Sequence, residues 1–410
     1  MGIFQVNLWE INKSFSLRFL GAVLAFSQGV IAYHWSQSIN SPLDFARQST
    51  AVCWPVFPAC GWVKLLSPGI IDATYWIFAL SAALAVLIFL FTRAGGLAAF
   101  FMWLATLFGF FLYTQDFRLS SNAGFLTFLL SFIYLLIPSK TFSFRLIVVA
   151  LYLAFALLKL QADWLSGFWI IEQLKVPDKL GEWLAALMTL VEMIAPLMLL
   201  IKDGRYFWSG WFTLVIYHAG MAWLGLTHLS LLFLGILVFL ALADIEDRKL
   251  EREYIYQSFI HPEPSRFWTF LFLAIFAFCQ LVSDFNWFHA HTRVQSFAAL
   301  YTPYQISKVE TCDGRLWKIY DQGWEASSFP TVEGRDQSMI CHPYLRFLDL
   351  KAECQQLKNE PGFRTLAGVF ESQRAFDGVS EIHFQSSDIC NPHYQYSDVG
   401  KVKWNTKHVQ

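Results

Sequence analysis

Charged residues are scarce in this 410-residue sequence: they make up 15% of it, whereas a soluble domain has about a quarter. Basic residues are not in excess, since 30 Lys and Arg stand against 31 Asp and Glu, and this balance gives no support for nucleic-acid binding. The apolar stretches also lack the polar faces that helices on the surface of a soluble protein present to water. The scarcity of charge excludes an ordinary soluble protein, and a lipid bilayer is the expected partner.

Long apolar runs are what the sequence does have, and apolar residues make up 56% of it. A helix needs about 20 apolar residues to cross the hydrocarbon core of a bilayer. The first run is too long for the apolar part of a removable signal peptide, so we interpret it as a transmembrane helix. Such runs occupy residues 15–35, 71–92, 95–115, 121–138, 143–160, 183–201, 206–223, 228–244 and 267–283. The sequence predicts an all-α polytopic membrane protein of about nine transmembrane helices over residues 1–283, followed by a small soluble α+β domain over 284–410.

Lys and Arg are unevenly distributed between the two sets of predicted loops, and cytoplasmic loops are the richer set in membrane proteins. One set, together with the N-terminal segment, holds Lys13, Arg18, Arg93, Lys140, Arg145, Lys202, Arg205, Arg248, Lys249 and Arg252. The opposite set holds Arg47, Lys64, Arg118, Lys175 and Lys179. We therefore expect a cytoplasmic N-terminus. After nine spans, residues 284–410 then lie on the periplasmic or extracellular side.

Cysteine placement gives an independent indication of this orientation. Of the seven cysteines, Cys279 lies in a predicted span, and none lies in a predicted cytoplasmic loop. Disulfides persist in oxidising compartments, so we predict structural bridges among the others, with their pairing left open. These six residues on the predicted outer side are Cys53, Cys60, Cys312, Cys341, Cys354 and Cys390.

Residues 284–410 carry signals of both strands and helix. The segments QISKVETC and RLWKIYD have the composition of short strands, and we expect them to end in turns at Asp313-Gly314 and Gln322-Gly323. Residues 343–358 are predicted to be helical. The tail is therefore expected to be a small extracytoplasmic α+β domain held by one or two disulfides.

Three ionisable residues lie within predicted spans, where a charge is costly and is treated as a functional hypothesis: Lys159, Glu192 and His218. Lys159 and His218 are predicted near the outer leaflet because their helices run outward, and Asn122 and His228 begin two other spans at a similar height. Plainer interpretations exist. A lysine at a helix end can extend to the headgroups, and a histidine in a span can simply hydrogen-bond another helix. A carboxylate in mid-membrane, however, requires a partner or a proton.

The stretch LLKLQADWLSGFW resembles the segment with the catalytic lysine in vitamin K-dependent γ-glutamyl carboxylase and its bacterial relatives, the horizontally transferred transmembrane domain proteins. That segment has a Lys-Leu pair, a short polar link, Asp-Trp and a glycine-aromatic pair. The matching positions here are Lys159, Leu160, Asp163, Trp164, Gly167 and Phe168. The resemblance continues in order over residues 100–245, with Glu192 before PLMLL, a basic turn holding Lys202 and Arg205, and the pair Tyr217-His218.

This resemblance implies a chemistry and a set of site residues. In that family the lysine deprotonates a reduced quinone, which reacts with oxygen; the strong base so formed removes a γ-proton from glutamate, and CO2 traps the carbanion. The resemblance implies Lys159 as catalytic base, His218 as its polar partner, a quinol-type lipid as cofactor, and no metal. An apolar site suits this role because desolvation favours the neutral amine of a lysine. The implied quinol-binding residues are Asp163, Trp164, Glu192, Asn122, Tyr217 and His228.

Two departures from the family narrow the expectation. The carboxylase has a histidine in an Asn-His-Ser-Tyr-Leu context, where this sequence has Ala123 within Asn122-Ala123-Gly124-Phe125-Leu126. The large outer domain that binds the peptide substrate is replaced by the short tail over 284–410. Deprotonation of a quinol survives both departures, whereas carboxylation of propeptide-bearing proteins does not follow from the resemblance.

The resemblance therefore implies a carboxylase-like enzyme of a bacterial inner membrane, of lyase type, that uses a quinol-type lipid and oxygen to modify an exported peptide or protein. One alternative is a quinone-linked thiol oxidase, in which Cys53 and Cys60 pass electrons to a quinone. Another is a non-enzymatic membrane scaffold or maturation partner for a secreted peptide, with the tail as its binding module.

Overall fold

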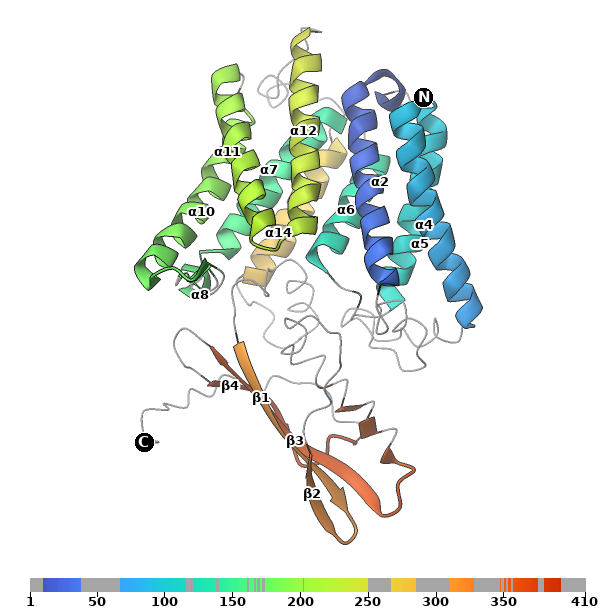
Figure 1. Ribbon diagram of the computed structural model, residues 1–410, viewed down its shortest axis with the longest axis vertical. Helices are drawn as coiled ribbons and strands as arrows, with labels where there is room; N and C mark the ends of the chain where they lie inside the picture. The colour runs from blue at the N-terminus through green and yellow to red at the C-terminus, as the bar shows by residue number, and fades with distance from the viewer. Residues whose placement is uncertain are drawn as a thin grey trace.

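A computed structural model of the chain shows a helical bundle with a small sheet beyond one of its ends (Figure 1). The residues that it describes are 10–37, 67–115, 119, 121–137, 140–160, 162–165, 167, 170–171, 174–201, 203–249, 267–284, 310–327, 347, 350–351, 353–354, 357–374 and 380–391.

The helices of the bundle lie roughly along one direction (Figure 1). They are α2 (Phe15–Ser36), α4 (Pro68–Phe91), α5 (Gly95–Gln115), α6 (Asn122–Leu136), α7 (Lys140–Leu158), α8 (Ala162–Leu165), α10 (Asp178–Met198), α11 (Gly204–Trp223), α12 (Thr227–Lys249) and α14 (Phe267–Asp284). In the described part of the chain, all of these except the four-residue α8 coincide with a predicted apolar run. Six of them, α2, α4, α5, α7, α10 and α12, are long and apolar enough to cross a membrane. The architecture is that of a polytopic membrane protein, and the number of nine spans stays a prediction.

Local capping explains where several helices begin. The Ser14 side chain accepts a hydrogen bond from the Leu17 amide at the start of α2, and Ser121 does the same for Gly124 at the start of α6. Such caps satisfy amides that have no partner within their own helix. Helix α10 begins at Asp178, directly after Pro177, which is earlier than the apolar run at 183 had indicated. The apolar run therefore indicates that α10 exists, while Pro177 indicates where its first turn begins.

Helix α2 is central to one half of the bundle, where it contacts α4, α5, α6 and α12. Gln28 of α2 is fully buried, and its Nε2 donates to Thr106 Oγ1 of α5 at 2.9 Å and to Ser131 Oγ of α6 at 2.8 Å. Polar bonds of this kind join helices in an apolar environment that otherwise offers no partners. The two bonds of Gln28 hold α5 and α6 against α2 within an otherwise hydrophobic core.

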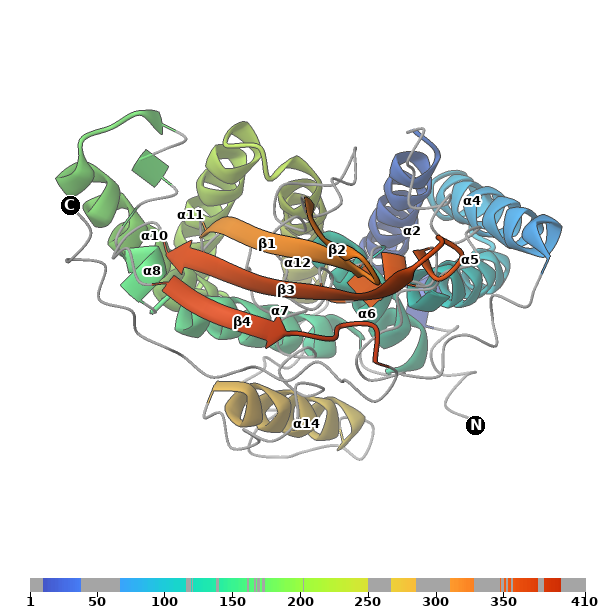
Figure 2. The ribbon, with the colours of Figure 1, turned by 90° about the horizontal axis from the view of Figure 1, so that it is seen from below.

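The other half of the bundle is built from α7, α10, α11 and α12. Helix α10 contacts α7, α8 and α11, and α11 in turn contacts α12. Figures 1 and 2 both show α10 and α11 at one edge of the bundle, with α8 beside the start of α10. This peripheral α10–α11 pair, packed on α7, positions the candidate site.

The tail contains a four-stranded antiparallel sheet in the order β2-β1-β3-β4, which lies across the end of the bundle (Figure 2). Its strands are β1 (Glu310–Tyr320), β2 (Gly323–Ser327), β3 (Phe363–Arg374) and β4 (Ser380–Ser386). The predicted turn at Gln322-Gly323 is confirmed, because Tyr320 pairs with Gly323 in the β1–β2 hairpin. The predicted turn at Asp313-Gly314 is wrong. Both residues pair with β3, and this continuous ladder overrides the local turn preference.

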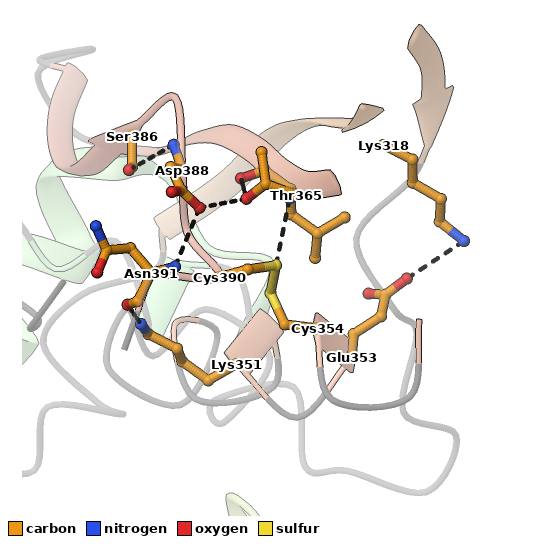
Figure 3. The surroundings of a disulfide bond; sticks show 10 residues. Lys318, Lys351, Glu353, Cys354, Thr365, Ser386, Asp388, Cys390 and Asn391 are labelled. Atoms are coloured by element: carbon orange, nitrogen blue, oxygen red, sulfur yellow. Dashed lines mark hydrogen bonds and ion pairs between the residues drawn. A yellow bond between two sulfur atoms is a disulfide. The ribbon is translucent and has the colours of Figure 1, made fainter. Parts of the chain in front are cut away.

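One face of the sheet is covered by part of the segment that was predicted to be helical. The described residues of that segment are helical as far as Leu357, and four of them, Phe347, Leu350, Cys354 and Leu357, pack on Leu316, Leu366, Phe370 and Ile389. A disulfide joins Cys354 to Cys390, with their Cα atoms 5.4 Å apart (Figure 3). The predicted bridging of the tail is thus confirmed for this pair. Cys53, Cys60 and Cys341 lie outside the described residues, as do the side chains of Cys312 and Cys279.

Candidate functional site

Lys159 is the first residue after α7, and its side chain turns into the bundle, where it is 4% exposed. Its Nζ lies 2.7 Å from Oε1 of Glu192 on α10, which is also 4% exposed, so the two form a buried ion pair. An opposite charge within hydrogen-bonding distance is what a carboxylate in an apolar helix requires. Lysine and glutamate, 33 positions apart in the sequence, therefore occupy one site.

Tyr217 of α11 joins both members of this pair. Its hydroxyl accepts a hydrogen bond from Lys159 Nζ at 3.0 Å and donates one to Glu192 Oε1 at 2.5 Å. The three side chains come from the end of α7, from α10 and from α11, and they form a closed triangle. We refer to Lys159, Glu192 and Tyr217 as the triad cluster.

Trp164 of α8 covers the amine of Lys159. The Nζ atom lies 4.7 Å from the centre of the indole ring, a distance at which the negative face of the ring attracts a cation. The ring is held in place because its Nε1 donates to Thr189 Oγ1 at 3.0 Å and to the Ala185 carbonyl at 3.2 Å. Thr189 lies one turn before Glu192 on α10, so one face of this helix holds both the acid and the residue that orients the indole.

His218, which was expected to be the polar partner of Lys159, faces another neighbour. Its Nε2 lies 2.5 Å from the Tyr152 hydroxyl of α7, and its ring stacks on Phe233 of α12 with centroids 5.0 Å apart. Among the described residues, the hydrogen bonds of Lys159 go to Glu192 and Tyr217. His218 is nevertheless adjacent to the triad cluster, since its ring centroid lies 5.1 Å from that of Tyr217.

His228, another predicted quinol-binding residue, belongs to a different group of polar side chains. Its Nε2 lies 3.1 Å from Ser27 Oγ of α2, and its ring lies 6.0 Å from that of His34. Ser27 in turn bonds Thr127 of α6. This group joins α2, α6 and α12, whereas the triad cluster joins α7, α10 and α11.

The structure thus brings Lys159, Trp164, Glu192 and Tyr217 together, places His218 beside them and separates His228 from them. The side chains of Asn122 and Asp163 lie outside the described residues.

Sequence reasoning missed Tyr152 and Thr189. A signal was present for Tyr152, which lies seven residues, or about two helical turns, before Lys159 and so on the same face of α7. Thr189 carried a similar signal, one turn before Glu192. Both are neutral hydroxyl residues, which a search for ionisable groups passes over.

Within the described residues, no group of three or more His, Cys, Asp or Glu side chains is arranged to hold a metal ion. The triad cluster itself offers a buried acid, a buried amine and a phenol, and the imidazole of His218 lies beside it. Groups of this kind move protons and stabilise charge.

Comparison of the chain with protein-family models, with curated proteins and with solved structures finds no match.

Proposed function

We propose that this protein is a membrane enzyme whose triad cluster takes a proton from a quinol-type lipid, and that it uses the quinol with oxygen to modify an exported peptide or protein. The observation that carries the proposal is the ion pair between Lys159 and Glu192, buried among apolar helices and bridged by Tyr217. A buried, hydrogen-bonded ion pair is a costly feature in an apolar bundle, and ionisable groups inside a membrane mark substrate or proton pathways.

The surroundings of the cluster suit a lipid-soluble reactant. Helices α10 and α11 lie at the edge of the bundle (Figure 1) and expose large apolar side chains, including Leu187, Ile194 and Ile216. A quinol dissolved in the bilayer would approach along these side chains without crossing water. Glu192 Oε2 is buried and has no hydrogen-bond partner within the described part of the chain, as a site that receives a hydroxyl requires.

The segment from Lys159 to Gly167 supports the carboxylase-like character of the proposal. Lys159 and Trp164 both belong to the segment that resembles the carboxylase, and the amine of Lys159 lies over the indole ring of Trp164. Ala123, which stands where the carboxylase has a histidine, carries no polar side chain. The proposal is therefore centred on the deprotonation of a quinol, and the modification of the exported peptide follows from the resemblance.

The test is oxidation of menadiol, a soluble quinol, by the purified protein in proteoliposomes under oxygen. Wild-type protein should oxidise menadiol above the rate of empty liposomes, and Lys159→Met should lower that rate by about 100-fold or more, as loss of an acid–base group does. Lys179→Met is the matched control, because Lys179 is exposed in the first turn of α10. Equal rates for wild type and Lys159→Met would refute the proposal.

One observation favours the scaffold alternative. The tail has an apolar cavity of about 430 Å³ lined by Trp317, Ile319, Tyr320, Gly323, Trp324 and Ala367, and Trp324 is 70% exposed. Exposed aromatic side chains around a hollow are a common feature of binding surfaces. If the protein were a scaffold, Trp324→Ser would abolish maturation of the secreted peptide in cells while Lys159→Met would leave it intact. The enzymatic proposal expects the loss in Lys159→Met.

A further inference from the structure

The ammonium group of Lys159 already has partners on several sides within the site. A lysine ammonium has three N–H donors and no acceptor. Here one points to Glu192 Oε1 and one to Tyr217 Oη, while the indole face of Trp164 covers the amine. In this arrangement the amine is a fixed cation, held on several sides by groups that favour its charge.

Glu192, in contrast, uses only half of its capacity. Oε1 accepts from both Lys159 and Tyr217, whereas Oε2 is buried and has no partner among the described residues. A buried carboxylate oxygen without a donor is costly, because its water shell has been removed and not replaced. The geometry therefore leaves one strong acceptor open beside a fixed positive charge.

His218, on the neighbouring helix α11, offers a second open atom. Its Nδ1 is buried without a described partner, and the residue is 5% exposed. The Tyr152 hydroxyl faces Nε2, and because a hydroxyl that donates to Nε2 leaves the ring proton on Nδ1, His218 can present an N–H donor. An open acceptor and an open donor on neighbouring helices are complementary to a hydroxyl group, which has one proton to give and lone pairs to receive.

On these grounds we infer that Glu192, through Oε2, is the proton acceptor for the hydroxyl of the bound quinol, and that Lys159 is the cation that stabilises the resulting oxyanion. This inference rests on the proposed function and reverses the roles that the family resemblance implies. The O–H bond of the ligand breaks, its electron pair stays on the ligand oxygen, and a new O–H bond forms on Oε2. The negative charge moves from Glu192 to the ligand oxygen and remains beside Lys159, so the net charge of the site with its bound ligand does not change.

The experiment is infrared difference spectroscopy of the full-length protein in lipid nanodiscs, with and without menadiol, in the absence of oxygen. Protonation of Glu192 creates the carbonyl stretch of a carboxylic acid, which a carboxylate lacks. Wild-type protein and Glu182→Gln should show this new band, and Glu192→Gln should not. Glu182 is the matched control because it is an exposed glutamate of the same helix.

Menadiol binding is measured on the same samples by equilibrium dialysis, which separates the possible failures. Saturable binding to wild type without the carboxylic-acid band would overturn the assignment of Glu192 and leave the quinol site standing, with Lys159 as the base. Absence of binding would overturn the proposed function and this inference together. A band that persists in Glu192→Gln would place the acceptor elsewhere and would also overturn the inference.

Discussion

Gly167 and Gly181 meet backbone to backbone where the segment after α8 crosses the first turn of α10. Gly167 has a φ of +69°, and a Cβ built on it would collide with the backbone of Gly181. A Cβ on Gly181 would in turn lie 3.2 Å from the Gly167 carbonyl oxygen and closer still to Ile171. This contact holds the α8 segment against α10, and so it places the Trp164 indole over the amine of Lys159. Steric crowding thus explains why the segment that resembles the carboxylase has a glycine at position 167.

Gly167→Ala should destabilise the protein by about 2–4 kcal/mol, because the left-handed φ and the collision act together. Gly220→Ala is the control. A Cβ on Gly220, inside α11, meets nothing within 4 Å, so this change should be neutral or stabilising by up to about 1 kcal/mol. Thermal unfolding in detergent measures both. A Gly167→Ala protein that melts with wild type would contradict the close approach of the two glycines.

Lys159→Arg should insert into the membrane but lose quinol oxidation, because the planar guanidinium is larger than an ammonium and cannot place a compact charge between Glu192 Oε1 and the Trp164 ring. Lys159→Met leaves Glu192 as an unpaired buried charge, which costs about 3–5 kcal/mol. The double variant Lys159→Met/Glu192→Gln should therefore be more stable than Lys159→Met and equally inactive. A fully active Arg variant would show that the site does not depend on the compact ammonium group of Lys159.

Tyr217→Phe should lower the activity while retaining the ion pair. The change removes the hydroxyl that joins Lys159 to Glu192 and costs about 1–3 kcal/mol of stability, since buried polar atoms lose a partner. Tyr206→Phe is the matched control on α11, because Tyr206 is 52% exposed. Rates of menadiol oxidation and melting temperatures of the two variants are compared. If the two variants had the same rates and melting temperatures, the Tyr217 hydroxyl would have no role in the site.

The Cys354–Cys390 disulfide should contribute about 2–4 kcal/mol to the stability of the tail. It closes a loop over 36 positions and ties the helical segment to the sheet (Figure 3). The variants Cys354→Ser, Cys390→Ser and the double variant should all be cleaved faster in the tail by a protease, and to similar extents, because each removes the same bond. Peptide mapping without reduction should recover the linked pair, and recovery of both cysteines as free thiols would refute it.

The predicted orientation can be tested with reporter fusions. A reporter at Gln410, which lies outside the described residues, should be periplasmic, and one near Arg248 should be cytoplasmic, because positive residues concentrate on the cytoplasmic side. In Figure 1 the end of α12 and the sheet lie at opposite ends of the bundle, in agreement with this arrangement. Two reporters on the same side would contradict the prediction that residues 267–283 cross the membrane, and with it the nine spans.

The sequence allowed the positions of the helices to be predicted well, because long apolar runs are a strong signal and the backbone in lipid must satisfy its own hydrogen bonds. Helix ends were less predictable: α12 continues to Lys249, past the apolar run and into a run of charged residues. The pairing of Cys354 with Cys390 could not be read from spacing, since it depends on how the helical segment packs on β3 and its neighbours.

Part of the site was also predictable. Lys159, Trp164, Glu192 and Tyr217 were singled out in the sequence, and they come together. Their pairing was not predictable, because it depends on how α7, α10 and α11 rotate against one another. Tyr217 and His218 are neighbours in the sequence, and only packing decides which of them reaches the amine.

That pair of neighbours also constrains how the site can open. Consecutive side chains leave a helix about 100° apart, so Tyr217 reaches Lys159 and Glu192 while His218 reaches Tyr152 and Phe233. Contacts on two sides therefore fix the rotation of α11 about its own axis, because a rotation would break both sets of contacts at once. Helix α10 carries its acid on one face and lipid-facing side chains on another. The orientation of α11 about its axis is therefore fixed by the site itself, so a reactant from the bilayer meets Tyr217 and His218 in one arrangement.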